Sequence, residues 1–587
     1  MTTAMRFGPQ ITPEGVTFRL WAPAAKRVDL LLDRPHPMPA LADGWYEAAI
    51  AGAGAGTRYQ YRIDGETVVP DPASHFQPED VFGSSEVIDH TQYQWRANWR
   101  GRAWQDAAVL ELHVGTFTPC GTFGGAIANL DHVRETGLTA IELMPVADFA
   151  GRRNWGYDGV LLYAPDSAYG RPDDLKRLID EAHLRGLMVF LDVVYNHFGP
   201  EANYLGRYAP SCFTSANTPW GSAIDYRVPQ VRSFAIGNAL HWLRHYRFDG
   251  LRLDAVHAIA EPGEPPFLHA LSRAVGEFAA ESGRVIHLVL ENDDNRAALL
   301  DPDTASPDGN YRAQWNDDYH HAWHVLLTGE RTGYYGDYAD DPHGHLVRAL
   351  SSGFAYQGEP SAHREGRRRG ESAAGLPPTA FVNFLQNHDQ IGNRPFGDRL
   401  SAQADKAALE AALAITLLAP MPPLMFMGEE WGSTTPFAFF CDFHGRLADA
   451  VRRGRRAEFK AAYERLGAEI PDPLADQTFQ AAVLDWHECA APEARARLDL
   501  VRRLLMTRQA EIAPHLAGAR FGPPAVRRDG VISVRWKLAN ARELQLLANL
   551  TRAPAPRPGA AAGRPIWGGT PAEVLAPWSV FWSIGAG

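Results

Sequence analysis

The sequence is poor in cysteine and has no long hydrophobic run. Only 4 of its 587 residues are cysteine, and no two of them have C-x-x-C spacing, so neither a zinc site nor a dithiol redox centre is predicted. No stretch approaches the ~20 apolar residues of a membrane span, and the first residues, MTTAMRFGPQ, lack the apolar centre of a signal peptide. We therefore expect a cytoplasmic protein with reduced thiols and no membrane contact.

The chain also lacks a basic face. Its 57 Lys and Arg residues are outnumbered by 69 Asp and Glu residues, which gives a formal net charge of −12. Two short basic runs, GRRRG at 366–370 and RRGRR at 452–456, are interpreted as solvated surface. An acidic protein without a basic stripe is a poor nucleic-acid binder, so we expect no nucleic-acid partner.

Several catalytic motifs are missing. No G-x-G-x-x-G opens a helix after a strand, and there is no Walker loop, no serine in a nucleophile elbow and no histidine group with metal-ligand spacing. These absences argue against dinucleotide, phosphoryl-transfer and serine-hydrolase chemistry.

The pattern of apolar segments changes twice along the chain, which is long enough for two to four domains. Residues 1–92 contain short β-type segments separated by Gly, Pro and Asp turns, which predicts an N-terminal β-sandwich. Residues 93–515 alternate β-type and helical segments. Residues 516–587 return to β-type segments and predict a C-terminal all-β domain, in which 554–565 reads as a flexible loop.

The central part contains eight candidate strands with helical segments between them. In chain order these strands are 107–114, 139–146, 187–194, 248–254, 285–291, 313–316, 380–387 and 422–430. Continuous apolar strands that alternate with helices indicate a parallel sheet buried on both faces. Eight such units predict a TIM (β/α)8 barrel with insertions, in the α/β class, and a doubly wound sheet is the alternative.

Polar side chains follow four of these strands at the end where each strand finishes. They are Asp192, Asn196 and His197 after the third strand, Arg252 and Asp254 on the fourth, Glu291 on the fifth, and Asn387, His388 and Asp389 on the seventh. In a TIM barrel the strand ends meet at one rim, where catalytic groups lie. The sequence therefore predicts a catalytic site rather than isolated structural ion pairs.

Carboxylates beside Arg and His suit glycoside chemistry. That reaction needs one carboxylic acid to protonate the leaving oxygen and one carboxylate to attack the sugar or to activate water. Arg252 and Asp254 lie two residues apart and so share a strand face, where the guanidinium would keep the carboxylate ionised. Glu291 would need a raised pKa to arrive protonated.

Four segments, DVVYNH at 192–197, GLRLDAVH at 250–257, LEND at 290–293 and QNHDQ at 386–390, resemble in order the four regions of the α-amylase superfamily, glycoside hydrolase family 13. The resemblance implies a retaining α-glucan enzyme in which Asp254 is the nucleophile, Glu291 the general acid/base and Asp389 the transition-state stabiliser. It also implies that four residues bind the sugar at the cleavage position, namely Arg252, His197, His388 and the aromatic platform Tyr157.

A finer resemblance covers nearly the whole chain. The β-rich N-terminus, similar to glucan-binding modules, and ELHVGTFTPCGTFGGAI at 111–127 resemble branching enzymes, debranching enzymes and maltooligosyltrehalose trehalohydrolases. NWGYDGVLLYAP at 154–165 and QWNDDYHHAWHVLLTGE at 314–330 favour the trehalohydrolases, which release trehalose from maltooligosyltrehalose and act after a maltooligosyltrehalose synthase. A glycogen branching or debranching enzyme is the alternative. A non-catalytic glucan-binding protein is disfavoured because all three acids are present.

Trehalose on the leaving-group side requires polar groups that contact its hydroxyls. Further candidate substrate-binding residues near strand ends are His257, Asn292, Asp293, Asn316, Asp317, Asp318, His320, Asn387, Gln390 and Asn393. The competing interpretation of each is a helix cap or a loop contact. Asn196 occupies a position that binds calcium in many amylases, but no further ligand cluster accompanies it. We expect no metal and no cofactor.

Overall fold

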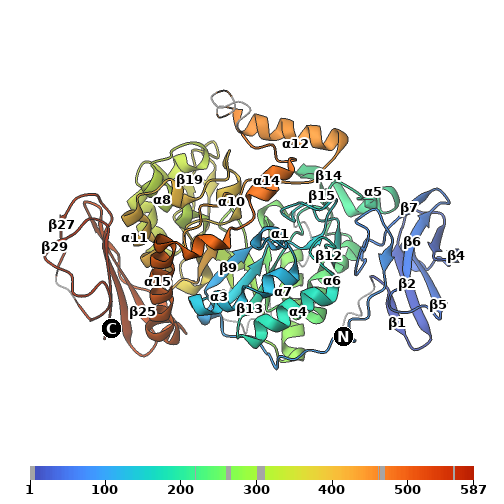
Figure 1. Cartoon of the computed structure of the whole chain (residues 1–587), viewed down its shortest axis with the longest axis horizontal. Helices are drawn as coiled ribbons and strands as arrows, with labels where there is room; N and C mark the ends of the chain where they lie inside the picture. The colour runs from blue at the N-terminus through green and yellow to red at the C-terminus, as the bar shows by residue number, and fades with distance from the viewer. Residues whose placement is uncertain are drawn as a thin grey trace.

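The computed structural model describes residues 7–218, 220–259, 266–300, 311–460, 462, 464, 470–559 and 562–586. Figure 1 shows a central barrel with a small β domain on each side, the N-terminal one in blue and the C-terminal one in red. None of the described helices is both long and apolar enough to span a bilayer.

The central part is a closed barrel of eight parallel strands. In chain order they are β9 (Val109–Leu112), β10 (Ala140–Leu143), β13 (Met188–Val193), β16 (Gly250–Leu253), β17 (His287–Leu290), β18 (Ala313–Trp315), β21 (Phe381–Phe384) and β22 (Pro423–Phe426). Each strand pairs with the next one in this order, and β22 closes the barrel on β9. Every residue of these strands is buried. The predicted barrel is confirmed, and the doubly wound sheet is excluded because the sheet has no open edge.

Amphipathic helices cover the outside of the barrel. The main ones are α3 (Leu130–Thr136), α4 (Pro172–Leu184), α6 (Pro229–His245), α7 (Phe267–Ser282), α8 (Asp317–Thr328), α9 (Pro342–Ser352), α11 (Lys406–Leu418) and α15 (Pro492–Thr507). In α4 a proline and two aspartates open the first turn, and Leu175, Leu178, Ile179 and Ala182 are buried on one face. This i, i+3, i+4, i+7 spacing is what makes a helix bury one side against a sheet.

The N-terminal domain is a β-sandwich, as predicted. One sheet contains β1 (Gln10–Thr12), β2 (Gly15–Trp21) and β5 (Trp45–Ala51), and the other contains β3 (Val28–Leu31), β4 (Pro35–Met38), β6 (Arg58–Ile63), β7 (Thr67–Val69) and β8 (Ser85–Glu86). Alternate residues of β2 are buried, which is the period-2 pattern of a strand that is half covered.

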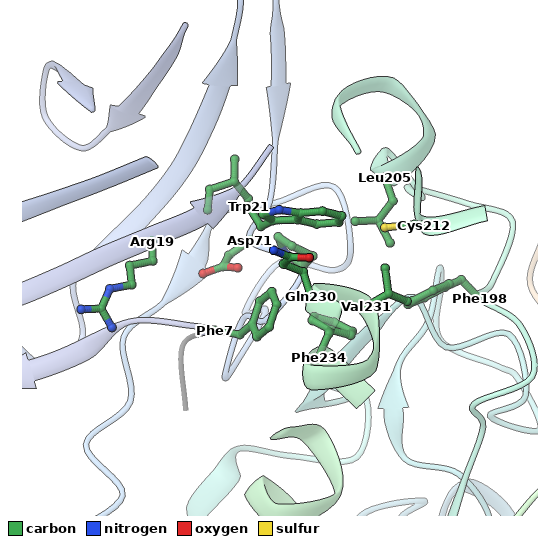
Figure 2. Close-up of a pocket in the computed structure, with 12 residues that line it drawn as sticks. Phe7, Arg19, Trp21, Asp71, Phe198, Leu205, Cys212, Gln230, Val231 and Phe234 are labelled. Carbon is green, nitrogen blue, oxygen red and sulfur yellow. The ribbon is translucent and has the colours of Figure 1, made fainter. Parts of the chain in front are cut away.

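The N-terminal domain packs on the barrel through aromatic side chains around a small cavity. Phe7 lies between Trp45 of the sandwich and Phe234 of α6, with ring centroids 4.9 and 5.1 Å away. Figure 2 shows this cavity, lined among others by Trp21, Cys212 and Phe234. Its volume of about 30 Å³ has room for about one or two waters, far less than the ~300 Å³ of a small ligand pocket. The cavity is therefore a packing defect rather than a sugar site.

The C-terminal domain is all-β, as predicted. Its long strands β25 (Val531–Leu538), β26 (Arg542–Asn549) and β30 (Ser579–Ala586) are antiparallel neighbours in a six-stranded sheet. Two buried indoles anchor this sheet to the barrel helices, because Trp536 donates to the Leu350 carbonyl of α9 at 2.9 Å and Trp582 to the Ala414 carbonyl of α11 at 3.1 Å. The prediction of a flexible loop over 554–565 is partly wrong. This segment contains β27 (Ala555–Pro556) and the start of β28 (Arg564–Trp567), and residues 560 and 561 lie outside the described part.

Candidate active site

The inward-facing side chains of the barrel strands change character along the strand direction. Near the start of the strands they are apolar and belong to one buried cluster, which includes Val109, Ala140, Phe190 and Val289. Two residues further along each of these strands, the same face carries Glu111, Glu142, Asp192 and Glu291. Residues i and i+2 of a strand share a face, so strand geometry alone gathers these carboxylates at the C-terminal rim.

Arg252 is the centre of this rim and is fully buried. Its Nη1 atom lies 2.6 Å from Asp192 Oδ2 and 2.8 Å from Asp254 Oδ1, and its Nη2 atom lies 4.0 Å from Glu291 Oε2. The guanidinium also stacks 4.1 Å from the centre of the Trp315 ring. Burial alone would lower the pKa of Arg252, but the surrounding carboxylates raise it well above its usual range. A permanent positive charge is thus held between the acids.

Asp254, at the end of β16, presents its carboxylate to the rim with both oxygens engaged. Oδ1 accepts from Arg252, and Oδ2 accepts from Asn196 Nδ2 at 2.8 Å. The same amide donates to the Asp254 carbonyl at 3.1 Å. Two donors fix the orientation of this carboxylate, which a nucleophile needs in order to face the anomeric carbon.

Glu291 lies on the neighbouring strand and is coupled to Asp254 through the backbone. Its Oε2 atom accepts from the N–H of Ala255, the residue after Asp254, at 2.6 Å. Ala255 has φ of 40°, a left-handed conformation that is uncommon for alanine and is found at functional sites. Burial raises the pKa of Glu291 to about 7, and Asp254 adds to this against the opposing charge of Arg252. Glu291 is therefore protonated in a large fraction of molecules at neutral pH.

His388 and Asp389 follow β21 at the start of α10 (His388–Gly392). The His388 ring contacts Glu111 Oε1 through Nδ1, and its Nε2 lies 3.6 Å from Asp389 Oδ1. Burial would lower the pKa of His388, but Asp389 and Glu111 outweigh it and raise the pKa to about 9. Asp389 itself is about half exposed, with a side-chain exposure of 45%, so its free oxygen is open to a ligand.

Two predicted sugar-binding residues form one wall of the site. Tyr157 donates to Asp192 Oδ2 at 2.5 Å, and its ring stacks on His388 with centroids 5.1 Å apart. His197 Nε2 contacts the Tyr157 carbonyl at 2.9 Å, and its ring stacks on the exposed Trp220. Trp220 was not among the predicted site residues, because it follows none of the eight predicted barrel strands. The structure brings it to the rim as a further aromatic surface.

The predicted leaving-group residues divide into rim residues and supporting residues. His257, Asp293 and Asp317 lie at the rim, close to the catalytic acids. His257 lowers the pKa of Glu291, while Asp389 raises it. Glu291 and Asp293 both raise the pKa of Asp317. Asn316, Asp318 and His320 are buried, and their hydrogen bonds run to other residues of the chain. For these three we correct the prediction of substrate contact. They have no surface left for a sugar and act as supports.

Three more predicted residues organise the loop that carries Asp389. The Asn387 side chain accepts from the Asp389 N–H at 2.9 Å, and the Gln390 side chain accepts from the Asn387 N–H at 3.1 Å, which together form a capping box. Asn393 is exposed and donates to Asp389 Oδ1 at 3.3 Å. Asn292 is buried and caps the following turn by accepting from Asp294 N. Of these four, Gln390 and Asn393 have exposed surface for a ligand.

The basic run at 366–370 is not simply solvated surface, as the sequence analysis had it. Arg369 has only 4% side-chain exposure, and it lies 2.7 Å from Asp318 and 3.2 Å from Asp293. Arg364 adds ion pairs to Asp293 and to Asp294. Burial would raise the pKa of Asp293, but Arg369 and Arg364 lower it below its usual range. These arginines come from a loop far along the chain, so only folding places them at the rim.

The charge on His388 predicts a pH-dependent contribution to stability. A histidine has a pKa near 6.5 when unfolded, and a folded value of about 9 means that the folded state holds the proton more tightly. The resulting stabilisation is complete below about pH 6.5 and is lost as pH rises through about 9, by roughly 3 kcal/mol at most. Urea unfolding of wild type and His388→Gln from pH 6 to 9.5 should show the difference in unfolding free energy shrinking with pH. A constant difference would contradict a raised pKa.

The family comparisons agree with this geometry. The family model "Alpha amylase, catalytic domain" matches residues 89–220, "Carbohydrate-binding module 48 (Isoamylase N-terminal domain)" matches 6–76, and a domain of unknown function, DUF3459, matches 519–582. A crystal structure of a provisionally named alpha amylase from Salmonella typhimurium is 44% identical, with a TM-score of 0.93 over 99% of this chain and 100% of that one. A pullulanase from Paenibacillus barengoltzii, 20% identical with a TM-score of 0.71, shares the fold. A barrel of the α-amylase type in which two carboxylates lie beside one arginine is characteristic of a glycosidase.

Relatives over the full length narrow this class. The malto-oligosyltrehalose trehalohydrolase of Deinococcus radiodurans is 42% identical over 506 residues, which are 85% of this chain and 82% of that protein. The enzyme of the same name from Rhizobium sp. (strain M-11) is 40% identical over 93% of both chains. A 1,4-alpha-glucan branching enzyme from Frankia casuarinae is 33% identical, but over only 42% of this chain. The chain belongs to the malto-oligosyltrehalose trehalohydrolase family.

Proposed function

We infer that this chain hydrolyses the α-1,4-glucosidic bond next to the terminal trehalose unit of maltooligosyltrehalose and releases free trehalose. The family supports the substrate, and one structural observation supports the chemistry. Asp254 and Glu291 flank a single guanidinium, and Glu291 accepts a hydrogen bond from the residue after Asp254. The carboxyl groups of Asp254 and Glu291 thus lie close together at the same end of the barrel. This arrangement suits a retaining mechanism, which requires a separation of ~5–5.5 Å.

In the first step the Asp254 carboxylate attacks the anomeric carbon of the glucan. The bond from this carbon to the trehalose oxygen breaks, and that oxygen takes the proton of Glu291, so trehalose leaves as a neutral alcohol. Arg252 and Asn196 hold the attacking carboxylate in place. The raised pKa of Glu291 supplies the proton near neutral pH.

In the second step water replaces trehalose at the site. The Glu291 carboxylate removes a proton from this water, whose oxygen attacks the anomeric carbon, and the ester bond to Asp254 breaks. A maltooligosaccharide leaves with its α configuration retained. In the transition state of each step the sugar ring carries positive charge, which the Asp389 carboxylate stabilises while it holds ring hydroxyls.

The wall formed by Tyr157, His197 and His388 binds the sugar at the cleavage position. Tyr157 supplies an aromatic platform that is held by Asp192 and by stacking on His388. The protonated His388 donates toward hydroxyl oxygens, and His197 is fixed by the Tyr157 carbonyl. Trp220, stacked on His197, extends this wall toward solvent.

Trehalose would occupy the side of Glu291 where His257, Asp293 and Asp317 lie. Asp293 is anchored by Arg364 and Arg369, so it is ionised and rigid and can accept hydrogen bonds from sugar hydroxyls. Burial and the charge of Glu291 raise the pKa of Asp317 well above its usual range. A protonated Asp317 could donate one hydrogen bond and accept another, which suits the hydroxyl pattern of a disaccharide.

Product analysis tests this function. Maltooligosyltrehalose incubated with the enzyme should yield free trehalose, and proton NMR during the first turnovers should show the α-anomer of the maltooligosaccharide before mutarotation. Appearance of the β-anomer first would contradict the retaining mechanism. If glycogen is branched or debranched while maltooligosyltrehalose is untouched, the alternative function would replace the one proposed.

The upstream enzyme, the cellular location and the domain boundaries of this protein are also proposals. The substrate must come from an enzyme that rearranges the reducing end of a maltooligosaccharide into a trehalose unit, and we propose a maltooligosyltrehalose synthase as this upstream partner. We also propose a cytoplasmic location, where the four free cysteines would stay reduced. The domain boundaries at 92/93 and 515/516 remain proposals that limited proteolysis would test.

A further inference from the structure

Four histidines that the mechanism does not use gather where the N-terminal domain meets the barrel. His75 and His90 lie on the segment that leads out of the sandwich, while His241 and His245 are four residues apart on α6. The centroids of the His75 and His241 rings are 4.6 Å apart, and those of His90 and His245 are 4.4 Å apart. One ring nitrogen from each of His75, His90 and His241 lies within 4.8 Å of the other two.

Five ring nitrogens of this cluster are shielded from solvent and have no hydrogen-bond partner among the described residues. His75 Nδ1 and both ring nitrogens of His90 and of His241 are buried and unpaired within the described residues. The Tyr163 backbone lies near His241, but it does not meet hydrogen-bond geometry with either nitrogen. Buried polar atoms are normally paired, so several unpaired imidazole nitrogens that converge on one point call for a missing partner.

A second histidine group in the same chain shows that clustering alone does not leave nitrogens unpaired. On α8, His320 contacts the Leu385 carbonyl at 2.5 Å and the Tyr335 hydroxyl at 3.1 Å, and His324 contacts Glu330 at 2.9 Å. In that group three ring nitrogens of His320 and His324 have protein partners, and His321 Nδ1 is buried without one. The cluster beside the sandwich differs because its nitrogens converge on one another and not on oxygens.

The charge state of the cluster suits a metal ligand. Burial lowers the pKa of His75 to about 3 and that of His245 to about 4, and it lowers the pKa of His90 and His241 well below the usual range. Neutral imidazole is the form that coordinates a metal. Two positive charges lie near the cluster and would oppose a bound cation. The Lys176 ammonium also lowers these pKa values, although Asp173 pairs with it at 2.9 Å. Arg244 acts on His245 from the same helix.

We propose that His75, His90 and His241, with His245 as the candidate fourth ligand, form a structural site for one zinc-class divalent cation that fastens the N-terminal domain to helix α6. Imidazole ligands suit Zn²⁺, Cu²⁺ and Ni²⁺, and structural zinc sites are closed and four-coordinate. Tetrahedral Zn–N bonds of about 2.0–2.1 Å require the ring nitrogens, now within 4.8 Å of one another, to approach by up to about 1.5 Å.

Metal analysis of the whole chain tests the site directly. The untagged full-length protein in a Cys120→Ser background, which removes the exposed thiol, is stripped with a chelator and dialysed against Zn²⁺. We expect one Zn²⁺ per chain, a thermal midpoint that rises with Zn²⁺ concentration, and X-ray absorption that shows only nitrogen or oxygen ligands with imidazole scattering. Failure to take up Zn²⁺, Cu²⁺ or Ni²⁺ would overturn the proposal, as would a shell without imidazole.

Variants locate the bound metal. His90→Gln, on the half-buried linker, and His241→Leu should each weaken Zn²⁺ binding by about 100-fold or more, because each removes one ligand. His36→Gln, on the distant strand β4, is the matched control and should keep full binding. Zn²⁺ that survives in the His90→Gln/His241→Leu double variant would place the metal elsewhere. If a variant does not fold, the X-ray absorption of the wild-type chain still decides between the outcomes.

Discussion

Asp254→Asn should reduce the hydrolysis of maltooligosyltrehalose by about 10⁴-fold or more, the loss expected when a group that acts in covalent catalysis is removed. Asparagine keeps the shape of aspartate but cannot form the ester with the anomeric carbon. Arg252 keeps its contact with Asp192, so the fold should survive. Steady-state kinetics at saturating substrate gives the loss, and circular dichroism verifies the fold.

Chemical rescue distinguishes the role of Asp254 from that of a merely structural acid. With the smaller Asp254→Gly variant, azide and an α-glycosyl fluoride, a single displacement should give the β-glycosyl azide. With Glu291→Ala, azide should intercept the glycosyl ester on Asp254 and give the α-glycosyl azide. These opposite configurations follow from one displacement in the first case and two in the second. If the two products were exchanged, the two roles would have to be exchanged as well.

Glu291→Gln should cause the second large loss, and its size should depend on the leaving group. Trehalose needs a proton to leave, so its release should slow by roughly 10³-fold. A glycosyl fluoride leaves without that proton, so its first step should be affected far less. The expected pattern is a collapse of kcat for maltooligosyltrehalose together with a nearly normal rate of glycosyl-enzyme formation from the fluoride, measured by rapid quench.

The same residue should set the alkaline limb of the pH profile. Glu291 has a pKa of about 7, so its acid form falls as pH rises above 7, and kcat/KM of the wild type should fall with it. In Glu291→Gln the residual activity should lack this limb. Glu429→Gln is the matched control, because burial also raises the pKa of Glu429 to about 7, while its carboxylate accepts from the Phe426 N–H and lies near Arg399 and Arg497 instead of the catalytic acids. An alkaline limb that moves in Glu429→Gln but not in Glu291→Gln would contradict the assignment.

The fold was predictable because its signals are local. Each of the eight strands is a short apolar run. Because side chains alternate along a strand, the residues near its end that face the barrel interior can be identified from the sequence. Arg252 and Asp254 could be placed together for that reason, and the structure has them 2.8 Å apart. Glu111 and Glu142 obey the same rule but were not selected, since both lie inside apolar runs and not at their ends.

Other parts of the site were hidden because they depend on pairs of distant segments. Arg369 looked like one charge in an exposed basic run, yet Asp318 and Asp293 neutralise it in a buried position. Asp318 looked like a rim residue, but two backbone N–H groups of Ala355 and Tyr356 enclose its carboxylate. The histidine cluster was missed in the same way. We found no metal-ligand spacing among the histidines of the sequence, yet His241 and His245 have the spacing H-x-x-x-H on one helix. Nothing local linked this pair to His75 or His90.

By itself the sequence determined which residues could face the barrel interior, because side chains alternate along a strand. It also determined which acids would end the strands, and the closure of eight parallel strands brings these ends to one rim. Only the tertiary structure decided which of those groups keep a charge and which are free to touch a sugar. Protonation and access depend on the partners that surround each group, and these partners come from loops and helices tens to hundreds of residues away.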